Sequence, residues 1–359
     1  MKFRIVDKFI VGKFLSSYFF VMGILLLVIG VIQITEKNQK IIENNLSFMD
    51  MLWYMLDFFP YVGNMITPIT TFIAVVFITA KMAGHSEIIA LLSSGISFRR
   101  LMRSYLYGAI VIAIINFIFT GWIIPNSNKD RIAFEIQYFE NPYHFSDRNI
   151  HIKVAPESYF YLEQYNNQSK VGYKLTLETI RDQKLVAKLS AQRIEWNEDS
   201  GKWEIRGWEL REFDGFKEHF SRGDDLDTLI NITPKDFDND WRLFETLTIN
   251  ELNEHISLLK SRGSEDVIVY EVEKQVRYAS PFTVILLTFI GLFVSARKAR
   301  GGTGFQIALG FLISFIYILF FWFSKTMAEA GGLPPALAIW IPNIIFSAIG
   351  FLLYKTVPR

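Results

Sequence analysis

Residues that could carry out catalysis are scattered along the 359-residue chain rather than grouped. The histidines lack the H-E-x-x-H spacing, or the paired His/Cys cluster, that would hold a metal. No G-x-S-x-G turn is present to expose a nucleophilic serine, and the carboxylates of the polar middle region fall on alternating strand faces. The sequence therefore predicts no catalytic residue and no metal site. The histidines are expected to be surface or ordinary core residues: His85, His144, His151, His219 and His255.

The chain also lacks a G-x-x-x-x-G-K-[ST] phosphate loop. Backbone amides and the lysine of that loop hold nucleotide phosphates, so this chain is not expected to hydrolyse ATP by that mechanism. We expect a protein that is not an enzyme and binds no cofactor of its own. Any ATP-driven step would need a partner chain that binds the nucleotide.

The most suggestive spacing lies in a short polar segment between two apolar stretches. Its serine can cap a short helix, and the glutamate after it suits the positive end of the helix dipole. Isoleucine and leucine side chains would form an apolar face, and a glycine would end the helix. Such a face needs a partner protein or the lipid headgroups to bury it, and the pattern favours neither. The predicted helix covers 85–95, with Ser86 as its cap, Glu87 in its first turn, Ile88, Leu91 and Leu92 on its apolar face, and Gly95 as its stop.

The elements that must position this segment are six uncharged stretches, each at least 19 residues long. Roughly 20 apolar residues span the ~30 Å hydrocarbon core of a bilayer. The chain is therefore predicted to be an α-helical polytopic membrane protein with six transmembrane helices. These stretches are Phe14–Thr35, Phe58–Ala80, Ser104–Asn128, Tyr278–Ala296, Gly301–Ser324 and Gly331–Tyr354.

Charge separates the polar middle of the chain from the rest. Residues 125–277 hold 21 Lys/Arg and 29 Asp/Glu, a net charge of −8, whereas the remainder holds 16 and 7, a net charge of +9. An acidic insert of this kind argues against nucleic acid as its partner. The absence of Cys excludes a disulfide scaffold.

Basic residues in the short connecting segments predict the orientation. If the N-terminus is cytoplasmic, the short cytoplasmic segments carry 13 Lys/Arg, against three on the other side. The positive-inside rule favours this arrangement, with both termini cytoplasmic and the insert periplasmic. The first apolar stretch is longer than a typical signal-peptide core and runs into a polar turn without a small-residue cleavage site, so we expect it to be retained as a helix.

Ion-coupled transport is disfavoured, because the stretches contain no ionisable side chain. Asp57 borders the second stretch and can remain at the interface. Coupling sites usually need buried carboxylates or histidines.

Glycines in the stretches are expected to allow close helix packing; these are Gly23, Gly30, Gly108, Gly121, Gly304 and Gly310.

The insert carries strand signals, with about seven strands predicted from alternating patterns and turn residues. Tyr173, Leu175 and Leu177 are expected on one face, and a β-bulge is expected at Gly207, where the apolar parity of the strand changes. We expect an antiparallel β-jellyroll-like domain. Thr248 begins a capping box that starts a helix after the strands.

These signals divide the chain into four parts. The predicted parts are 1–128 with the first three transmembrane helices and the 85–95 helix, 129–247 with the periplasmic β-jellyroll-like domain, 248–277 with a periplasmic helical connector, and 278–359 with the last three transmembrane helices.

At this point the chain resembles a known family, the lipopolysaccharide-export permeases of the LptF/LptG type. The similarity rests on Ser86-Glu87-Ile88 followed by Ser94-Gly95, on a basic N-terminus around Asp7-Lys8-Phe9, and on the Gly331–Pro335 turn. It extends over almost the whole chain, because the order of three spans, β-rich insert, helix and three spans is also similar. The LptG-like branch resembles it slightly more.

The resemblance implies a permease subunit of an ABC transporter that extracts lipopolysaccharide from the inner membrane. A homologous second permease would pair with this chain. A cytoplasmic ABC ATPase dimer would bind the 85–95 segment as a coupling helix, and the contact residues would be Ser86, Glu87, Ile88, Leu91 and Gly95. The insert would pass the lipid to a periplasmic jellyroll bridge. Lys37 and Lys40 match positions where family members place basic residues facing lipid phosphates, although Glu36 and Glu43 lie among them and a solvated loop is the alternative.

Two other functions fit the same layout. One is the permease of another ABC-type exporter, with a lipoprotein or a drug as its cargo. The other is a membrane sensor or scaffold whose periplasmic insert binds a ligand without transport. Co-purification of an ATPase and identification of the bound lipid discriminate among the three.

Overall fold

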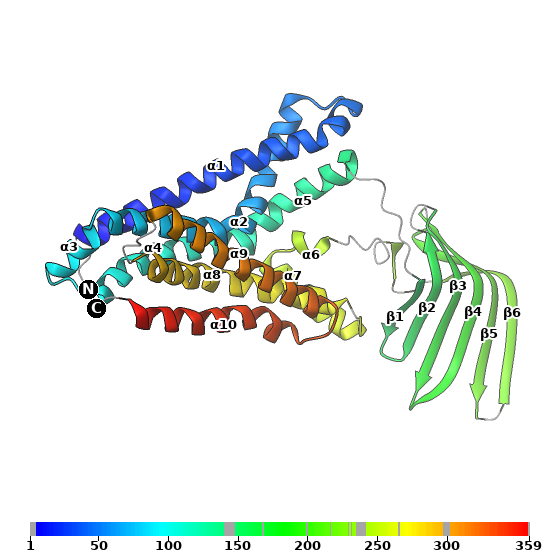
Figure 1. Cartoon of the computed structure of the whole chain (residues 1–359). Coiled ribbons are helices and arrows are strands. Elements are labelled where there is room, and N and C mark those ends of the chain that lie inside the picture. Colours follow the sequence, from blue (N-terminus) through cyan, green and yellow to red (C-terminus); the bar gives the residue numbers. More distant parts are fainter. Residues whose placement is uncertain are drawn as a thin grey trace. The chain divides into compact units, whose positions relative to one another are not determined.

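The computed structural model divides the chain into two compact units, a helical unit and a β unit (Figure 1). The helical unit comprises Met1–Phe139, Phe244–Asn253 and Ile268–Arg359, and the β unit comprises Glu140–Leu243 and Glu254–Val267. The structure describes residues 5–139, 148–166, 169–198, 200–215, 217–228, 230, 232–234, 242–264, 266–296 and 302–357. His144 and residues 297–300 therefore lie outside the described residues, together with 1–4.

Long apolar helices build the first unit, and six of them in the described residues are long and apolar enough to cross a membrane. This confirms the predicted polytopic helical membrane protein. The third is interrupted by π-helical turns. The elements are α1 (Ile5–Glu43), α2 (Phe48–Gly84), α3 (Glu87–Ser93), α4 (Phe98–Ile118), η1 (Phe119–Ile123), α5 (Ile124–Phe134), η2 (Glu135–Phe139), α6 (Leu243–Thr246), α8 (Val267–Ser295), α9 (Gly302–Glu329) and α10 (Pro335–Thr356).

Several helices continue well beyond their uncharged stretches. The polar turn expected after the first stretch is instead helical through Glu43, because Gln, Glu and Lys are good helix formers. Residues 129–139, grouped with the insert by composition, continue the third span as helix. Consequently ionisable side chains lie on the same helices as the apolar stretches, near their ends.

The helices differ in how much of their apolar surface the unit buries. Of the most apolar window of each helix, 61% is buried in α2 but 11% in α1. α2 therefore lies at the centre, whereas Phe20 and Leu27 of α1 and Phe323 of α9 are exposed. In a membrane these exposed faces contact lipid or another helix.

Glycines allow close approach at some of the predicted positions but not at all of them. A Cβ on Gly108 of α4 would lie 2.5 Å from Phe14 of α1, and one on Gly310 of α9 would lie 2.5 Å from Phe72 of α2. A Cβ on Gly23 or Gly304 would have no neighbour within 4 Å. Close packing is thus specific to particular helix pairs.

The described strands of the β unit form one antiparallel sheet in sequential order. The inserted antiparallel β domain is therefore confirmed. Sequential neighbours in a single sheet do not show the crossing connections between two sheets that a jellyroll has. The strands are β1 (Arg148–Ala155), β2 (Ser158–Asn166), β3 (Val171–Arg181), β4 (Lys184–Asn197), β5 (Lys202–Asp214) and β6 (Lys217–Thr228).

Along one line across the sheet, the side chains that point to the core change from one set of alternate residues to the other. We call this line the crease. In β4, Ala191 and Ile194 are an odd number of residues apart, which would put them on opposite faces of a regular strand. Both nevertheless pack in the same core. Following the strand register across the sheet, the crease residues are Asn149, Glu163, Lys174, Gln192, Gly207 and Asp224.

The crease corrects two predictions. Lys174 has a φ of 53° and Gly207 a φ of 64°, and such left-handed residues invert the faces without changing the pairing. Tyr173 therefore does not share the face of Leu175 and is largely exposed. The β-bulge expected at Gly207 is wrong, because the pairing of β5 with β4 has the same register on either side of it.

A helix follows the sheet, as predicted. In α7 (Ile249–Arg262), the Thr248 hydroxyl accepts from the Glu251 amide at 3.4 Å, and the Glu251 carboxylate accepts from the Thr248 amide at 2.7 Å. This confirms the capping box. Leu252 and Ile256 are buried on its apolar face, and Gly263 ends it with a φ of 67°.

Candidate functional sites at the two ends of the helical unit

The predicted contact segment forms α3, at the end of the helical unit where both chain termini lie (Figure 1). The predicted cap is wrong in its chemistry: Ser86 precedes the helix with a left-handed φ of 58°, and its side chain makes no capping hydrogen bond. A left-handed residue turns the chain sharply between α2 and α3. The predicted stop is confirmed, because Gly95 has a φ of 85° and the Ile96 amide donates to the Leu91 carbonyl at 3.2 Å.

One face of α3 is fixed to the unit and the other is open. Ile88 is 3% exposed and belongs to the main core, and Leu91 packs against that core. Ile89, on the other side, is 53% exposed. An apolar side chain in this position can join a contact with another protein or with lipid.

Glu87 carries the charge of this open region. Its carboxylate lies 3.8 Å from Lys13 Nζ of α1 and 4.0 Å from His85 Nδ1, and its side chain is 39% exposed. An ion pair this exposed contributes little to stability, roughly 0–1 kcal/mol. The carboxylate therefore remains available to a cation on another molecule.

A buried ion pair beneath α3 was not predicted from the sequence. Asp7 of α1 is fully buried, contacts Arg100 of α4 and accepts a hydrogen bond from the Ser104 hydroxyl at 2.7 Å. The two helices are thus joined near α3, and a force on one reaches the other. The signal available in the sequence was a single carboxylate in an otherwise basic N-terminal segment.

At the other end of the unit, Arg131 of α5 is the centre of a buried polar network. Its side chain is 2% exposed and donates to Glu135 at 3.0 Å, to Glu245 at 2.8 Å and to Asn128 at 2.9 Å. Its guanidinium also stacks 4.0 Å from the Tyr61 ring centroid of α2. Every side of this cation therefore has a partner, as burial of a charge requires.

A second buried arginine fixes α6. Arg277 of α8 is 3% exposed and donates to the Leu247 carbonyl at 2.6 Å, to the Phe244 carbonyl at 2.9 Å and to Glu273 at 2.8 Å. Carbonyls at a helix C-terminus have no partner within the helix, and cations stabilise them. Asn128 adds a hydrogen bond of 3.0 Å to the Glu245 carbonyl.

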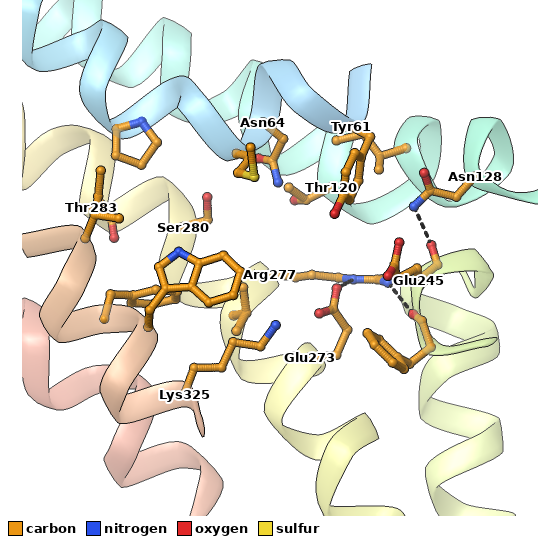
Figure 2. Close-up of a pocket in the computed structure, with 18 of the residues that line it drawn as sticks. Tyr61, Asn64, Thr120, Asn128, Glu245, Glu273, Arg277, Ser280, Thr283 and Lys325 are labelled. Carbon is orange, nitrogen blue, oxygen red and sulfur yellow. Dashed lines mark hydrogen bonds and ion pairs between the residues drawn. The ribbon is translucent and has the colours of Figure 1, made fainter. Parts of the chain in front are cut away.

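A cavity of about 290 Å³ lies beside this network, between α2, α5, α8 and α9. Figure 2 shows Arg277, Glu273 and Lys325 on one side of it, facing Tyr61 and Asn64. Its lining also includes apolar side chains, among them Pro68, Ile318 and Phe321. A space lined by both charged and apolar side chains matches an amphiphile. The lining residues are Tyr61, Asn64, Met65, Pro68, Thr120, Ile124, Asn128, Phe244, Glu245, Glu273, Val276, Arg277, Ser280, Thr283, Tyr317, Ile318, Phe321, Trp322 and Lys325.

Lys37 and Lys40 are placed on the last turns of α1, and neither lines this cavity. Lys37 Nζ lies 5.8 Å from the ring centroid of Phe139. The residues predicted for α3 are thus brought together, whereas these two lysines lie elsewhere on the unit. Among the described residues, no group of three or more His, Cys, Asp or Glu could hold a metal ion.

Comparison with known proteins gives one family. The family model described as lipopolysaccharide export system permease LptF/LptG matches residues 8–356 of the chain. The match includes α3, the network around Arg131 and both halves of the set of apolar helices. No curated protein matches the chain.

Proposed function

The chain belongs to the lipopolysaccharide export system permease family LptF/LptG, an inner-membrane family, and from that premise we propose that it is the permease subunit of an ABC exporter. The observation that carries this proposal is the family match along nearly the whole chain. In the proposal, a cytoplasmic ABC ATPase dimer binds α3, and a homologous second permease completes the path for the lipid. The termini are cytoplasmic, and the insert is periplasmic and delivers lipid to a periplasmic jellyroll bridge.

The contacts of α3 explain how a partner could move the helices. Glu87 and Ile89 offer a charge and an apolar side chain to the ATPase, while Ile88 attaches α3 to the core. That core also contains Ile10 and Phe14 of α1. Asp7 connects α1 to α4. A displacement of α3 by ATP binding on the partner would therefore displace α1 and α4 together.

The open face of α1 supports a path for lipid beside that helix. Its middle turns expose Phe20, Leu27 and Val31, which acyl chains can contact. Lys37 and Lys40 follow on the same helix, where lysines can bind the phosphates of a glycolipid. Moving α1 against a second permease would narrow the space between them and expel the lipid. The chain itself would make or break no covalent bond.

The docking part of the proposal is tested with the ATPase co-expressed and purified with the permease. We expect Glu87→Ala to lower ATPase binding by about tenfold or more, since a charge-assisted contact contributes roughly 1.5–3 kcal/mol. Lys13→Gln is the matched control, because it removes the ion pair with Glu87 but keeps the carboxylate. Equal binding by Glu87→Ala and the unaltered chain would contradict docking on α3.

The cargo is tested with photo-crosslinking amino acids at Lys37 and at exposed Tyr173 of β3. In liposomes that contain lipopolysaccharide, ATP should increase capture of the lipid at both positions. The mass spectrum of the captured molecule identifies the cargo. Capture of a lipoprotein or a drug-like molecule would assign another exporter, and no capture under ATP turnover would contradict transport.

A further inference from the structure

The backbone passes between the helical unit and the β unit at four places, and one arginine holds the chain at the first two. The helical unit is interrupted after Phe139 and resumes at Phe244, and it is interrupted again after Asn253 and resumes at Ile268. Glu135 lies in the last helical turn before the first connection, and Glu245 follows directly after the second. Arg131 forms ion pairs with both carboxylates, at 3.0 and 2.8 Å. We call these two attachments, 135–139 and 244–247, the roots of the insert.

The three charges are arranged so that neither root can move alone. Arg131 Nη1 binds Glu135 and Nη2 binds Glu245, so the planar guanidinium fixes the direction of each carboxylate. All three side chains are largely buried, and separation of either pair would leave a desolvated charge. The two roots are therefore held as one body.

Two further contacts extend this body into the membrane helices. The Tyr54 hydroxyl of α2 donates to Glu135 at 3.0 Å, and the Gln33 amide of α1 donates to Tyr54 at 2.9 Å. From the other side, Arg277 of α8 holds the carbonyls of the second root. A continuous chain of hydrogen bonds thus runs from α1 through α2 to both roots.

We propose that Arg131 is a positioning residue that locks the two roots into one junction, through which a movement of α1 and α2 reaches the insert. This inference rests on the proposed transport function. It adds the place at which a movement of the helices would be passed to the insert. Energetic coupling travels through packed side chains and hydrogen-bond networks with discrete arrangements. The junction supplies such a network at the first two of the four places where the backbone passes between the units.

The first test separates transport from ATP hydrolysis. Glu245→Gln keeps the size of the side chain and removes its charge. The ion pair between Arg131 and the second root is therefore lost. We expect ATP hydrolysis to stay within about twofold, while lipid captured on β3 per ATP falls by about tenfold, a typical size for coupling between sites. An unchanged ratio of capture to hydrolysis would overturn the proposal.

The matched control is an exposed ion pair on neighbouring residues. Lys129 of α5 lies 3.4 Å from Glu251 of α7, and both side chains are 45% exposed. Lys129→Gln should leave the ratio of lipid capture to ATP hydrolysis unchanged, because a surface pair transmits little force. If it lowered the ratio as much as Glu245→Gln, the effect would not belong to the buried junction.

A reversible cross-link can restore the junction in the absence of the ion pair. The chain has no cysteine, so a variant with Asn128→Cys and Glu245→Cys contains only these two thiols. The two native residues are in contact, since Asn128 Nδ2 donates to the Glu245 carbonyl. Joined by a short bis-methanethiosulfonate cross-linker, which forms a disulfide with each cysteine, this variant should regain lipid capture, and reduction of the two disulfides should abolish it. Capture independent of the cross-link would contradict a role in coupling.

Hydrogen exchange tests the junction without any assumption about cargo. If the unaltered protein captures no lipid, the proposed function fails, and the junction is judged by exchange alone. Glu245→Gln should accelerate exchange at its own root and also at 135–139, by about tenfold or more. An effect confined to 244–247 would show that the roots are independent and would overturn the inference.

Discussion

The two ends of the helical unit handle their charges in opposite ways. At the α3 end, Glu87 is 39% exposed and has only loose ion pairs at 3.8 and 4.0 Å. At the junction, Arg131 is 2% exposed and its pairs are 3.0 and 2.8 Å long. Exposed charges remain free to bind another molecule, whereas buried and fully paired charges fix geometry. In our proposals, recognition therefore belongs to α3 and mechanical connection to the junction.

The position of each buried pair sharpens this contrast. The Asp7–Arg100 pair also lies near α3, but beneath it, between α1 and α4. The recognition surface therefore rests on a fixed base. Under the proposed function, motion imposed on α3 would be passed inward through this base to α1 and α4.

The largest expected effect comes from breaking the junction completely. Arg131→Leu leaves Glu135 and Glu245 without their cation, and removal of one partner from a buried ion pair costs about 3–5 kcal/mol. The melting temperature of the purified protein in detergent should fall strongly. Lys129→Gln should cost less than about 1 kcal/mol. Equal melting temperatures for the two variants would contradict the claim that the buried ion pairs of Arg131 stabilise the junction more than the exposed Lys129–Glu251 pair does.

A second prediction tests whether the base beneath α3 is rigid. Gly108→Ala places a Cβ 2.5 Å from the fully buried Phe14, so one of the helices must shift. Overpacking of this kind costs about 1–3 kcal/mol. Gly23→Ala, with no neighbour within 4 Å, is the control and should be neutral or stabilising in the same melting assay. Tolerance of both substitutions would mean that α1 and α4 can separate freely.

A third prediction concerns α7, which begins directly after the junction. Thr248→Ala removes the capping box and should cost about 1 kcal/mol. Hydrogen bonds from the Thr248 amide and hydroxyl hold the pKa of Glu251 below its usual range. The stabilisation that the ionised Glu251 carboxylate gives through the capping box is therefore present at neutral pH. It decreases as the pH falls through the lowered pKa of Glu251. The difference in stability between Thr248→Ala and the unaltered protein should shrink in acid, and a difference that grows in acid would contradict the cap.

The sequence predicted features that depend on near neighbours. The apolar stretches, the Thr248 capping box and the Gly95 stop each follow from residues within a few positions of one another. The crease in the sheet was missed, because left-handed Lys174 is unusual for a side chain of that type and its pairing spans several strands. The chemistry before α3 was also mispredicted, since a left-handed Ser86 cannot be distinguished from a capping serine by its type.

The ion pairs were missed for a different reason. Arg131 and Glu245 lie 114 positions apart in the chain, and Asp7 and Arg100 lie 93 apart. Only the fold decides that these side chains meet. Composition shows charges near the ends of apolar stretches, but it does not tell a buried pair from a solvated one. The difference between the two ends of the unit therefore emerged only from the structure.

A small effect on stability should accompany a large effect on function at Glu87. Glu87→Ala should change the stability of the isolated permease by less than about 1 kcal/mol, because its ion pairs are exposed. The most direct test of the central claim is the affinity of the ATPase for this variant, measured beside its melting temperature. We predict binding weakened by about tenfold or more at an unchanged melting temperature. Unchanged binding, or weaker binding only in parallel with unfolding, would contradict the assignment of recognition to α3.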